Sequence, residues 1–184
     1  RNSENSPEFL ENHSKIEELI KFMSFSSQKE QDEWLIEQIK LNLNEDELKH
    51  DDIIVINPDS RTTRNNVGYI RSELFKQGIQ NHLAGVDTSA NIFFRTDNPS
   101  VTFTGIYRAK GNEAGMVYVI NAHECNGEGQ GLATLRNRLF TAITRSKAWV
   151  RVIGYGDKMI GLVEEFEKLK QKNFKLEFDY PTDE

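Results

Sequence analysis

Short apolar runs alternate along the chain with longer stretches in which apolar residues recur at helical spacing. Ile53–Ile56 and Met116–Ile120 are continuous hydrophobic runs, which is typical of strands buried on both faces of a sheet. Alternation and β-branching predict another strand over Val101–Tyr107, and shorter runs predict strands at Leu19–Met23 and Trp149–Ile153. The pattern therefore predicts strands distributed over most of the chain.

Helical spacing lies between these strands. Ser27 and Glu30 fit a capping box that opens a first helix. Thr62 or Thr63 can cap a second helix, and Gly78 is a suitable stop for it. A third helix is predicted at Thr134–Ile143. The apolar stripes of the first, second and C-terminal helices are Trp34, Leu35, Ile39 and Leu43; Val67, Ile70 and Leu74; and Met159, Ile160, Leu162, Val163, Phe166 and Leu169.

Weaker patterns complete the prediction. His82–Gly85 and Ile92–Phe94 are short extended pieces, Asn126–Gly131 is a loop, and Phe174–Tyr180 alternates with period two like an added edge strand. Strands that alternate with helices predict an α/β fold, with a mostly parallel sheet covered by helices on both faces. Ligands of such sheets gather at the carboxyl ends of the strands, so we expect functional residues there.

Length and composition indicate a single domain. We place it at residues 16–184, after a flexible tail at residues 1–15, and the start at Arg1 suggests a cut inside a longer protein. The single cysteine, Cys125, and four histidines without ligand spacing predict neither a disulfide nor a metal site and favour a cytoplasmic protein. No apolar run is long enough to span a bilayer, so we expect no membrane partner.

Charge is unevenly distributed. The net charge of −6 argues against a protein that coats nucleic acid non-specifically. Acidic residues concentrate in Glu4–Asp52 and Glu164–Glu184, whereas Arg61–Arg151 is basic. A single cation in that stretch can belong to a solvated face. Their concentration favours a local basic track.

Two segments in the basic stretch combine cations with groups that can bind sugar or phosphate. They are Gly105–Glu113 (GIYRAKGNE) and Leu139–Lys147 (LFTAITRSK), and each lies where a strand meets a polar turn or helix. Together they resemble motifs V and VI of superfamily 1 helicases of the UvrD/Rep type. The resemblance covers Leu19–Asp157.

The resemblance implies a RecA-like (P-loop NTPase-type) fold and a position as the second of two motor lobes. UvrD and Rep insert a large helical domain before motif V. Here the interval between the strand near Ile56 and motif V is already filled, so no large helical insertion is expected. The implied partners are the N-terminal RecA-like lobe of the same protein and single-stranded DNA, with RNA as an alternative.

The resemblance also implies ATP and Mg²⁺ as cofactors, shared with that other lobe. Hydrolysis needs a glycine-rich loop with a lysine (Walker A) and a carboxylate for Mg²⁺ (Walker B). Gly127–Gly131 has no Lys-Ser or Lys-Thr after it, so we interpret it as a flexible connection. We therefore expect this chain to be inactive as an ATP hydrolase on its own.

Arg145 is the candidate catalytic residue and Glu113 the candidate ribose ligand. A guanidinium near the end of a helix could stabilise charge that develops on the γ-phosphate; the alternative is an ion pair at the helix end. Glu113 follows Lys110 and Gly111, whose turn the resemblance assigns to nucleotide binding. The alternative for Glu113 is a carboxylate that accepts hydrogen bonds from turn amides.

Hydroxyls, an aromatic ring and cations near the exit of the Val101–Tyr107 strand suit a nucleic-acid backbone. The candidates there are Thr102, Thr104, Tyr107 and Arg108, with Asn57, Arg61 and Arg64 after the preceding strand. The segment departs from the usual motif V because Gly105, Tyr107 and Asn112 replace threonine, histidine and leucine. These departures affect the expected contacts with a nucleic-acid strand more than the expected ribose binding.

The sequence supports a main function and an alternative. The main hypothesis is the C-terminal motor lobe of an ATP-dependent superfamily 1 DNA helicase or translocase, which completes an ATP site between lobes and grips a single strand. The alternative is a noncatalytic RecA-like module that binds nucleic acid or a protein. A glycine-rich lysine loop upstream in the parent reading frame would distinguish them.

Overall fold

A six-stranded parallel sheet forms the centre of the molecule. The computed structural model describes residues 15–87, 99–127, 131–172 and 174. The strand order is β1-β6-β5-β2-β4-β3, and every neighbouring pair is parallel. The strands are β1 (Ile20–Phe25), β2 (Ile53–Asn57), β3 (Asn81–Leu83), β4 (Val101–Gly105), β5 (Ala114–Val119) and β6 (Ser146–Tyr155).

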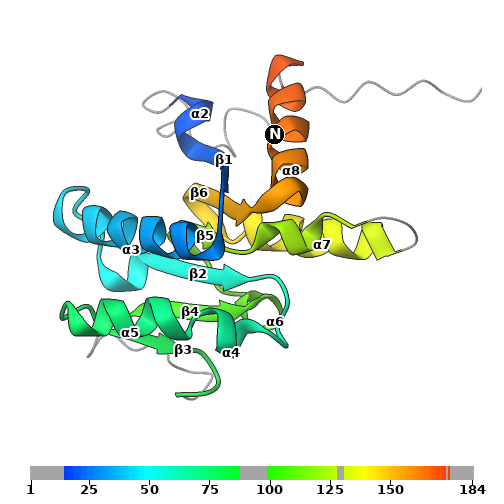
Figure 1. Ribbon diagram of the computed structural model, residues 1–184. Coiled ribbons are helices and arrows are strands. Elements are labelled where there is room, and N and C mark those ends of the chain that lie inside the picture. Colours follow the sequence, from blue (N-terminus) through cyan, green and yellow to red (C-terminus); the bar gives the residue numbers. More distant parts are fainter. Residues whose placement is uncertain (1–14, 88–98, 128–130, 173, 175–184) are drawn as a thin grey trace, which may run out of the picture.

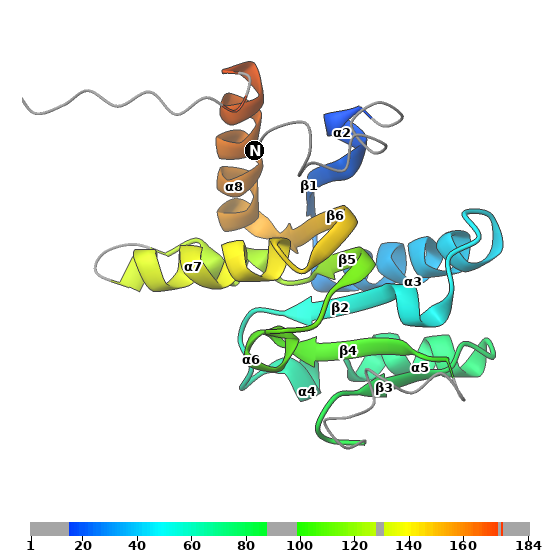
Figure 2. The same ribbon diagram turned by 180° about the vertical axis from the view of Figure 1, so that it is seen from behind.

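Helices cover both faces of the sheet. α3 and α5 lie in front of it in Figure 1, and α6, α7 and α8 pack on the other face, as the turned view in Figure 2 shows. The helices are α2 (Ile16–Leu19), α3 (Gln28–Asn44), η1 (His50–Asp52), α4 (Thr63–Asn66), α5 (Gly68–Lys76), α6 (Ile106–Ala109), η3 (Ala122–Cys125), α7 (Leu132–Ile143) and α8 (Gly156–Gln171).

Strand β2 shows why the sheet needs two helical layers. Ile53 and Val55 join the apolar cluster under α3 and α5, whereas Ile54 and Ile56 join the cluster under α6, α7 and α8. All four side chains are buried, and each contributes about 1.5–3 kcal/mol by its removal from water. The parallel α/β architecture predicted from the sequence is confirmed.

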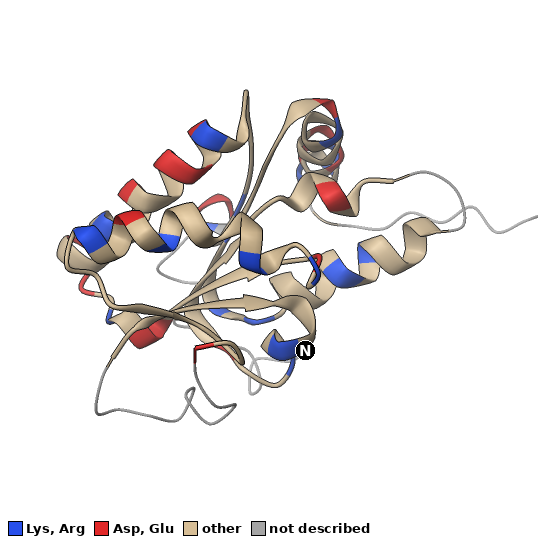
Figure 3. Cartoon of the chain, turned by 60° about the horizontal axis from the view of Figure 1, so that its bottom comes forward, with Lys and Arg blue, Asp and Glu red and all other residues tan. Residues whose placement is uncertain are grey.

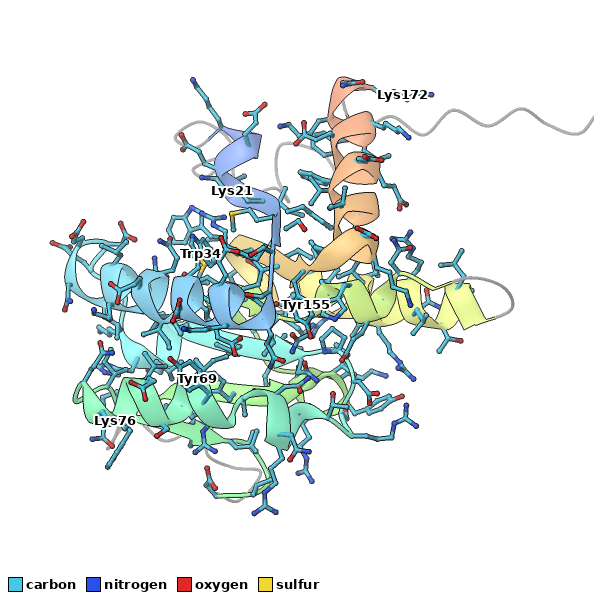
Figure 4. All side chains as sticks on the ribbon, viewed as in Figure 1. Lys21, Trp34, Tyr69, Lys76, Tyr155 and Lys172 are labelled. Carbon is cyan, nitrogen blue, oxygen red and sulfur yellow. The ribbon has the colours of Figure 1, made fainter. Side chains whose placement is uncertain are left out.

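The first helix forms as predicted. The Ser27 hydroxyl accepts a hydrogen bond from the Glu30 amide at 3.3 Å. The Glu30 carboxylate accepts one from the Ser26 amide at 2.8 Å and not from the Ser27 amide, so only the Ser27 half of the predicted capping box is present. The half-buried Trp34 of α3 packs against the core (Figure 4), with its ring centroid 5.5 Å from that of Phe25 and 6.3 Å from that of Tyr118.

Of the element boundaries that differ from the prediction, two change how the chain connects its elements. The helix after β2 is divided into α4 and α5 at Val67, next to Gly68, a residue with low helix propensity. The strand predicted over Val101–Tyr107 ends at Gly105, because the chain turns there into α6. A Cβ atom on Gly105 would lie 2.8 Å from Ser60 Oγ, so the turn depends on close packing against the loop after β2.

Four predicted features concern residues that the structure does not describe. Outside the described ranges lie Ile92–Phe94, the tail at residues 1–14, residues 128–130 of the predicted loop, and residues 175–180 of the proposed edge strand. The described part of the interval between β2 and β4 contains only α4, α5 and β3, without a large helical insertion.

Candidate functional site

Glu113 and Arg145 come together at the end of the sheet where strands β5 and β6 begin. The Ala114 amide donates to the Arg145 carbonyl at 3.1 Å, and Ala114 pairs with Ser146 at the start of β5 and β6. The expectation that both segments would lie at carboxyl ends is therefore wrong for these two residues. Each precedes its strand, and adjacent parallel strands begin at the same edge, so the return connections deliver both residues there.

The turn before β5 leaves the Glu113 carboxylate free. Gly111 has φ +91°, and Asn112 holds the turn by donating from its amide to the Ala109 carbonyl at 3.0 Å and from its side chain to the Arg108 carbonyl at 3.1 Å. Glu113 is exposed and has neither a hydrogen bond nor an ion pair with any described residue. Its role as a turn-stabilising carboxylate is thus not supported.

The Arg145 side chain is held at the end of α7. Its Nε donates to the Thr141 carbonyl at 3.2 Å, and its Nη2 donates to the Thr144 hydroxyl at 3.3 Å. Cations are stabilised at this end of a helix because the last carbonyls carry partial negative charge. Among the described residues no carboxylate pairs with Arg145, so the guanidinium keeps donors available for an anion.

The segment that resembles motif V and the helix of the segment that resembles motif VI also meet at a groove between α6 and α7. A cavity of about 260 Å³ lies there. Its lining residues are Ile106, Tyr107, Lys110, Thr134, Asn137, Arg138 and Thr141. Lys110, a candidate nucleotide ligand, is exposed at this groove and has no partner within the described ranges.

Three candidate nucleic-acid residues have buried side chains. Asn57 donates to the Asp59 carbonyl at 2.6 Å and accepts from Asn121 Nδ2 at 2.9 Å, which ties the ends of β2 and β5 together. The Thr102 hydroxyl lies 3.2 Å from His82 Nε2, and the Thr104 hydroxyl donates to the Gly105 carbonyl. These contacts stabilise the fold, so the three residues are left out of the interface considered below.

The other four candidates reach the surface. Tyr107 is 69% exposed, and Arg64 is exposed without a partner among the described residues. Arg61 is paired with Asp59 at 3.1 Å in an exposed ion pair of little net energy. The Arg108 guanidinium packs over Gly85, where an added Cβ would lie 1.9 Å from Nη1.

The sequence analysis did not predict a buried polar network at the carboxyl ends of the strands. Gln31 accepts from the Asn121 amide at 3.0 Å, and its Nε2 donates to Asp32 at 3.0 Å. Burial raises the pKa of Asp32 to about 6. Tyr155 ends β6 at this edge (Figure 4), with its ring centroid 4.1 Å from that of His123, whose pKa is lowered by burial. Only the fold assembles these residues, which are widely separated in the chain.

Thiol and metal chemistry find no support in the described ranges. Cys125 is buried, and burial raises the pKa of its thiol to about 12, so it is not a nucleophilic thiolate at neutral pH. No group of three or more His, Cys, Asp or Glu that could hold a metal ion occurs among the described residues. No described helix is both long and apolar enough to cross a membrane.

Comparison with known families and structures agrees with the resemblance seen in the sequence. Residues 100–153 match the family described as the UvrD-like helicase C-terminal domain, and this range contains both motif segments. No curated protein sequence matches the chain.

Two solved structures share the fold. The C-terminal domain of a possible DNA helicase from Lactobacillus plantarum WCFS1 superposes with a TM-score of 0.52 and 17% identity, over 80% of this chain and 79% of that one. The C-terminal domain of the DEAD-box protein Dbp5 gives a TM-score of 0.54 and 15% identity, over 87% of both chains. At these identities the two structures support the RecA-like α/β fold alone, and the likeness to a helicase C-terminal domain rests on the family match over residues 100–153.

Proposed function

We propose that this chain is the second RecA-like lobe of an ATP-dependent superfamily 1 helicase or translocase. It would close on a nucleotide held mainly by the N-terminal lobe of the same protein. The observation that carries the proposal is the meeting of Glu113 and Arg145 at the start of β5 and β6. Neither side chain has an oppositely charged partner within the described ranges, so both are available to a ligand.

The two side chains suit different parts of ATP. Glu113 can accept hydrogen bonds from a ribose hydroxyl, and Gly111 and Lys110 would shape the turn beside it. Arg145 can donate to γ-phosphate oxygens while charge develops on them. Mg²⁺ and the glycine-rich phosphate loop would be supplied by the N-terminal lobe. Closure of the lobes would then complete the site.

The nucleic-acid contacts would come from the exposed candidates. Arg61 and Arg64 follow β2, and Tyr107 and Arg108 follow β4, which is its neighbour in the sheet. Cations there can neutralise phosphates, and an exposed tyrosine ring can stack on a base. Single-stranded DNA is the proposed partner, because the resemblance is to DNA helicases. Single-stranded RNA is the alternative partner.

The decisive variant is Arg145→Ala in the full-length parent protein. Nucleic-acid-stimulated ATPase activity should fall by about 10³-fold or more, because arginine fingers contribute roughly 10³–10⁵ in rate, while ATP affinity changes less. Arg136→Ala is a matched control on the same helix, since Arg136 pairs with Glu165 at 2.6 Å. Turnover by the Arg145 variant equal to that of the control would reject the assignment.

A noncatalytic RecA-like module is the second candidate. It is favoured by the departures from motif V at Gly105, Tyr107 and Asn112, of which Asn112 holds a turn through its side chain. Such a module would need no nucleotide. A parent reading frame without a glycine-rich, lysine-containing phosphate loop would decide for this candidate.

A further inference from the structure

We propose that the groove between α6 and α7 binds a phosphodiester group of single-stranded nucleic acid, with Arg138 as its central cation. The phosphate chemistry follows from the groove itself. The choice of nucleic acid as its source rests on the proposed function. Arg138 lies outside the residues assigned above to nucleotide or strand binding.

The lining of the groove suits an anion. Lys110 and Arg138 supply positive charge, and Thr134 and Asn137 supply a hydroxyl and an amide group, whereas the Thr141 hydroxyl already donates to the Asn137 carbonyl at 2.7 Å. None of the residues that line the groove is acidic. Helix α7 itself carries Arg136 and Arg138 and no acidic residue (Figure 3). Hydroxyls, amides and cations are the groups with which proteins contact nucleic-acid phosphates.

Arg138 has unfilled hydrogen-bonding capacity in the described structure. Its Nε is buried without a hydrogen-bond partner, and its guanidinium makes no hydrogen bond or ion pair with a described residue. Arg136, two residues earlier, instead pairs with Glu165 at 2.6 Å. A buried donor without a partner loses its hydrogen bonds to water and gains nothing in return. A phosphate that orders the guanidinium around itself would recover part of that loss.

The nearby acids do not neutralise Arg138 by direct contact. Asp59 is engaged by Arg61, and Glu124 Oε2 is itself buried without a hydrogen-bond partner in the described part. Burial raises the pKa of Glu124, and Asp59 raises it further, while Arg138 opposes the shift. Glu124 is therefore a competitor for Arg138 rather than its bonded partner. Removing the charge of Glu124 should strengthen phosphate binding.

Two residues that line the groove favour a polymer over a free phosphate. Tyr107 is 69% exposed and can stack on a base. The Thr141 carbonyl accepts the hydrogen bond from Arg145 Nε. Arg145 lies two positions beyond Ile143, the last residue of α7, and seven positions after Arg138. Helix α7 and the turn at its C-terminus thus connect the proposed nucleic-acid contact to the proposed nucleotide contact.

The proposal can be tested on this 184-residue chain by NMR. A ¹⁵N-labelled sample is titrated with an eight-nucleotide oligo(dT), and the Arg138 Nε–H signal, identified by its loss in Arg138→Gln, is followed. The signal should shift and saturate. Arg138→Gln should weaken binding about 5–10-fold and lower the salt slope by about 1. Glu124→Gln should tighten binding. Lys29→Gln, on α3, is the charge-matched control.

Each result has a defined meaning. An unmoved Arg138 signal, or equal binding by Arg138→Gln and Lys29→Gln, would overturn the proposal. A parallel titration with tripolyphosphate distinguishes the sources of phosphate. An equal shift at equal concentration would overturn the nucleic-acid assignment. Thermal melts check that each variant is folded. Loss of binding in Arg138→Gln together with unchanged ATPase activity in full-length Arg145→Ala would support the groove and reject the nucleotide site. Unchanged binding in Arg138→Gln together with loss of ATPase activity in Arg145→Ala would reject the groove and support the nucleotide site.

Discussion

At the residue scale, Glu113 is an exposed carboxylate whose hydrogen-bonding capacity is unused among the described residues. Glu113→Gln in the full-length protein should raise the KM for ATP about tenfold and change kcat less. A hydrogen bond to a charged group is worth about 1.5–3 kcal/mol, and this bond would form already in the ground state. Steady-state ATPase assays measure both constants. Glu164→Gln on α8 is the control, and matching KM values for the two variants would exclude the ribose role.

Asp32 predicts a pH-dependent stability. Burial raises its pKa from 3.8 to about 6, so the folded chain holds this proton more tightly than the unfolded chain. Stability from this group is therefore complete below pH 3.8 and is lost as the pH rises to about 6. Asp32→Asn should raise the free energy of unfolding by about 1–3 kcal/mol at pH 7 and by less at pH 4. Urea titrations at both pH values test this, and an equal gain at both would contradict it.

At the element scale, the β4–α6 junction depends on Gly105. An added Cβ would lie 2.8 Å from Ser60 Oγ and 3.1 Å from Ser60 Cα, so the loop after β2 would have to move. Gly105→Ala should lower the free energy of unfolding by about 1–3 kcal/mol, as overpacking does. Urea unfolding compares it with Gly68→Ala, where nothing lies within 4 Å of the added atom. Equal stability of the two variants would show that the junction tolerates the movement.

Elements differed in how well local patterns predicted them. The cap and the apolar stripe of the first helix are local features of its own sequence, and the helix begins after Ser27 as predicted. Gly105 fits a continuing strand equally well by pattern. Its strand ends because Ser60, 45 positions earlier in the sequence, packs against the backbone. Local patterns cannot report such a contact.

At the scale of the whole molecule, the proposed nucleotide ligands lie on one edge of a single lobe. Phosphates would meet Arg145 there but no glycine-rich cradle in the described residues, so the isolated chain should bind ATP only weakly. Isothermal titration calorimetry of the 184-residue chain should show no binding in the micromolar range. A micromolar Kd would mean that this lobe holds ATP alone, against the proposed division between lobes.

The sequence by itself determined the parallel α/β architecture and the two motif segments, because buried runs, helical stripes and a run such as LFTAITRSK are local properties. Only the tertiary structure decided which side chains are exposed and which distant residues lie next to one another. Asn57, Thr102 and Thr104 are polar yet face the interior. Glu113 and Arg145 are 32 positions apart and meet because β5 and β6 pair in parallel from one edge. Strand pairing is a long-range interaction, and it fixes which residues share a surface.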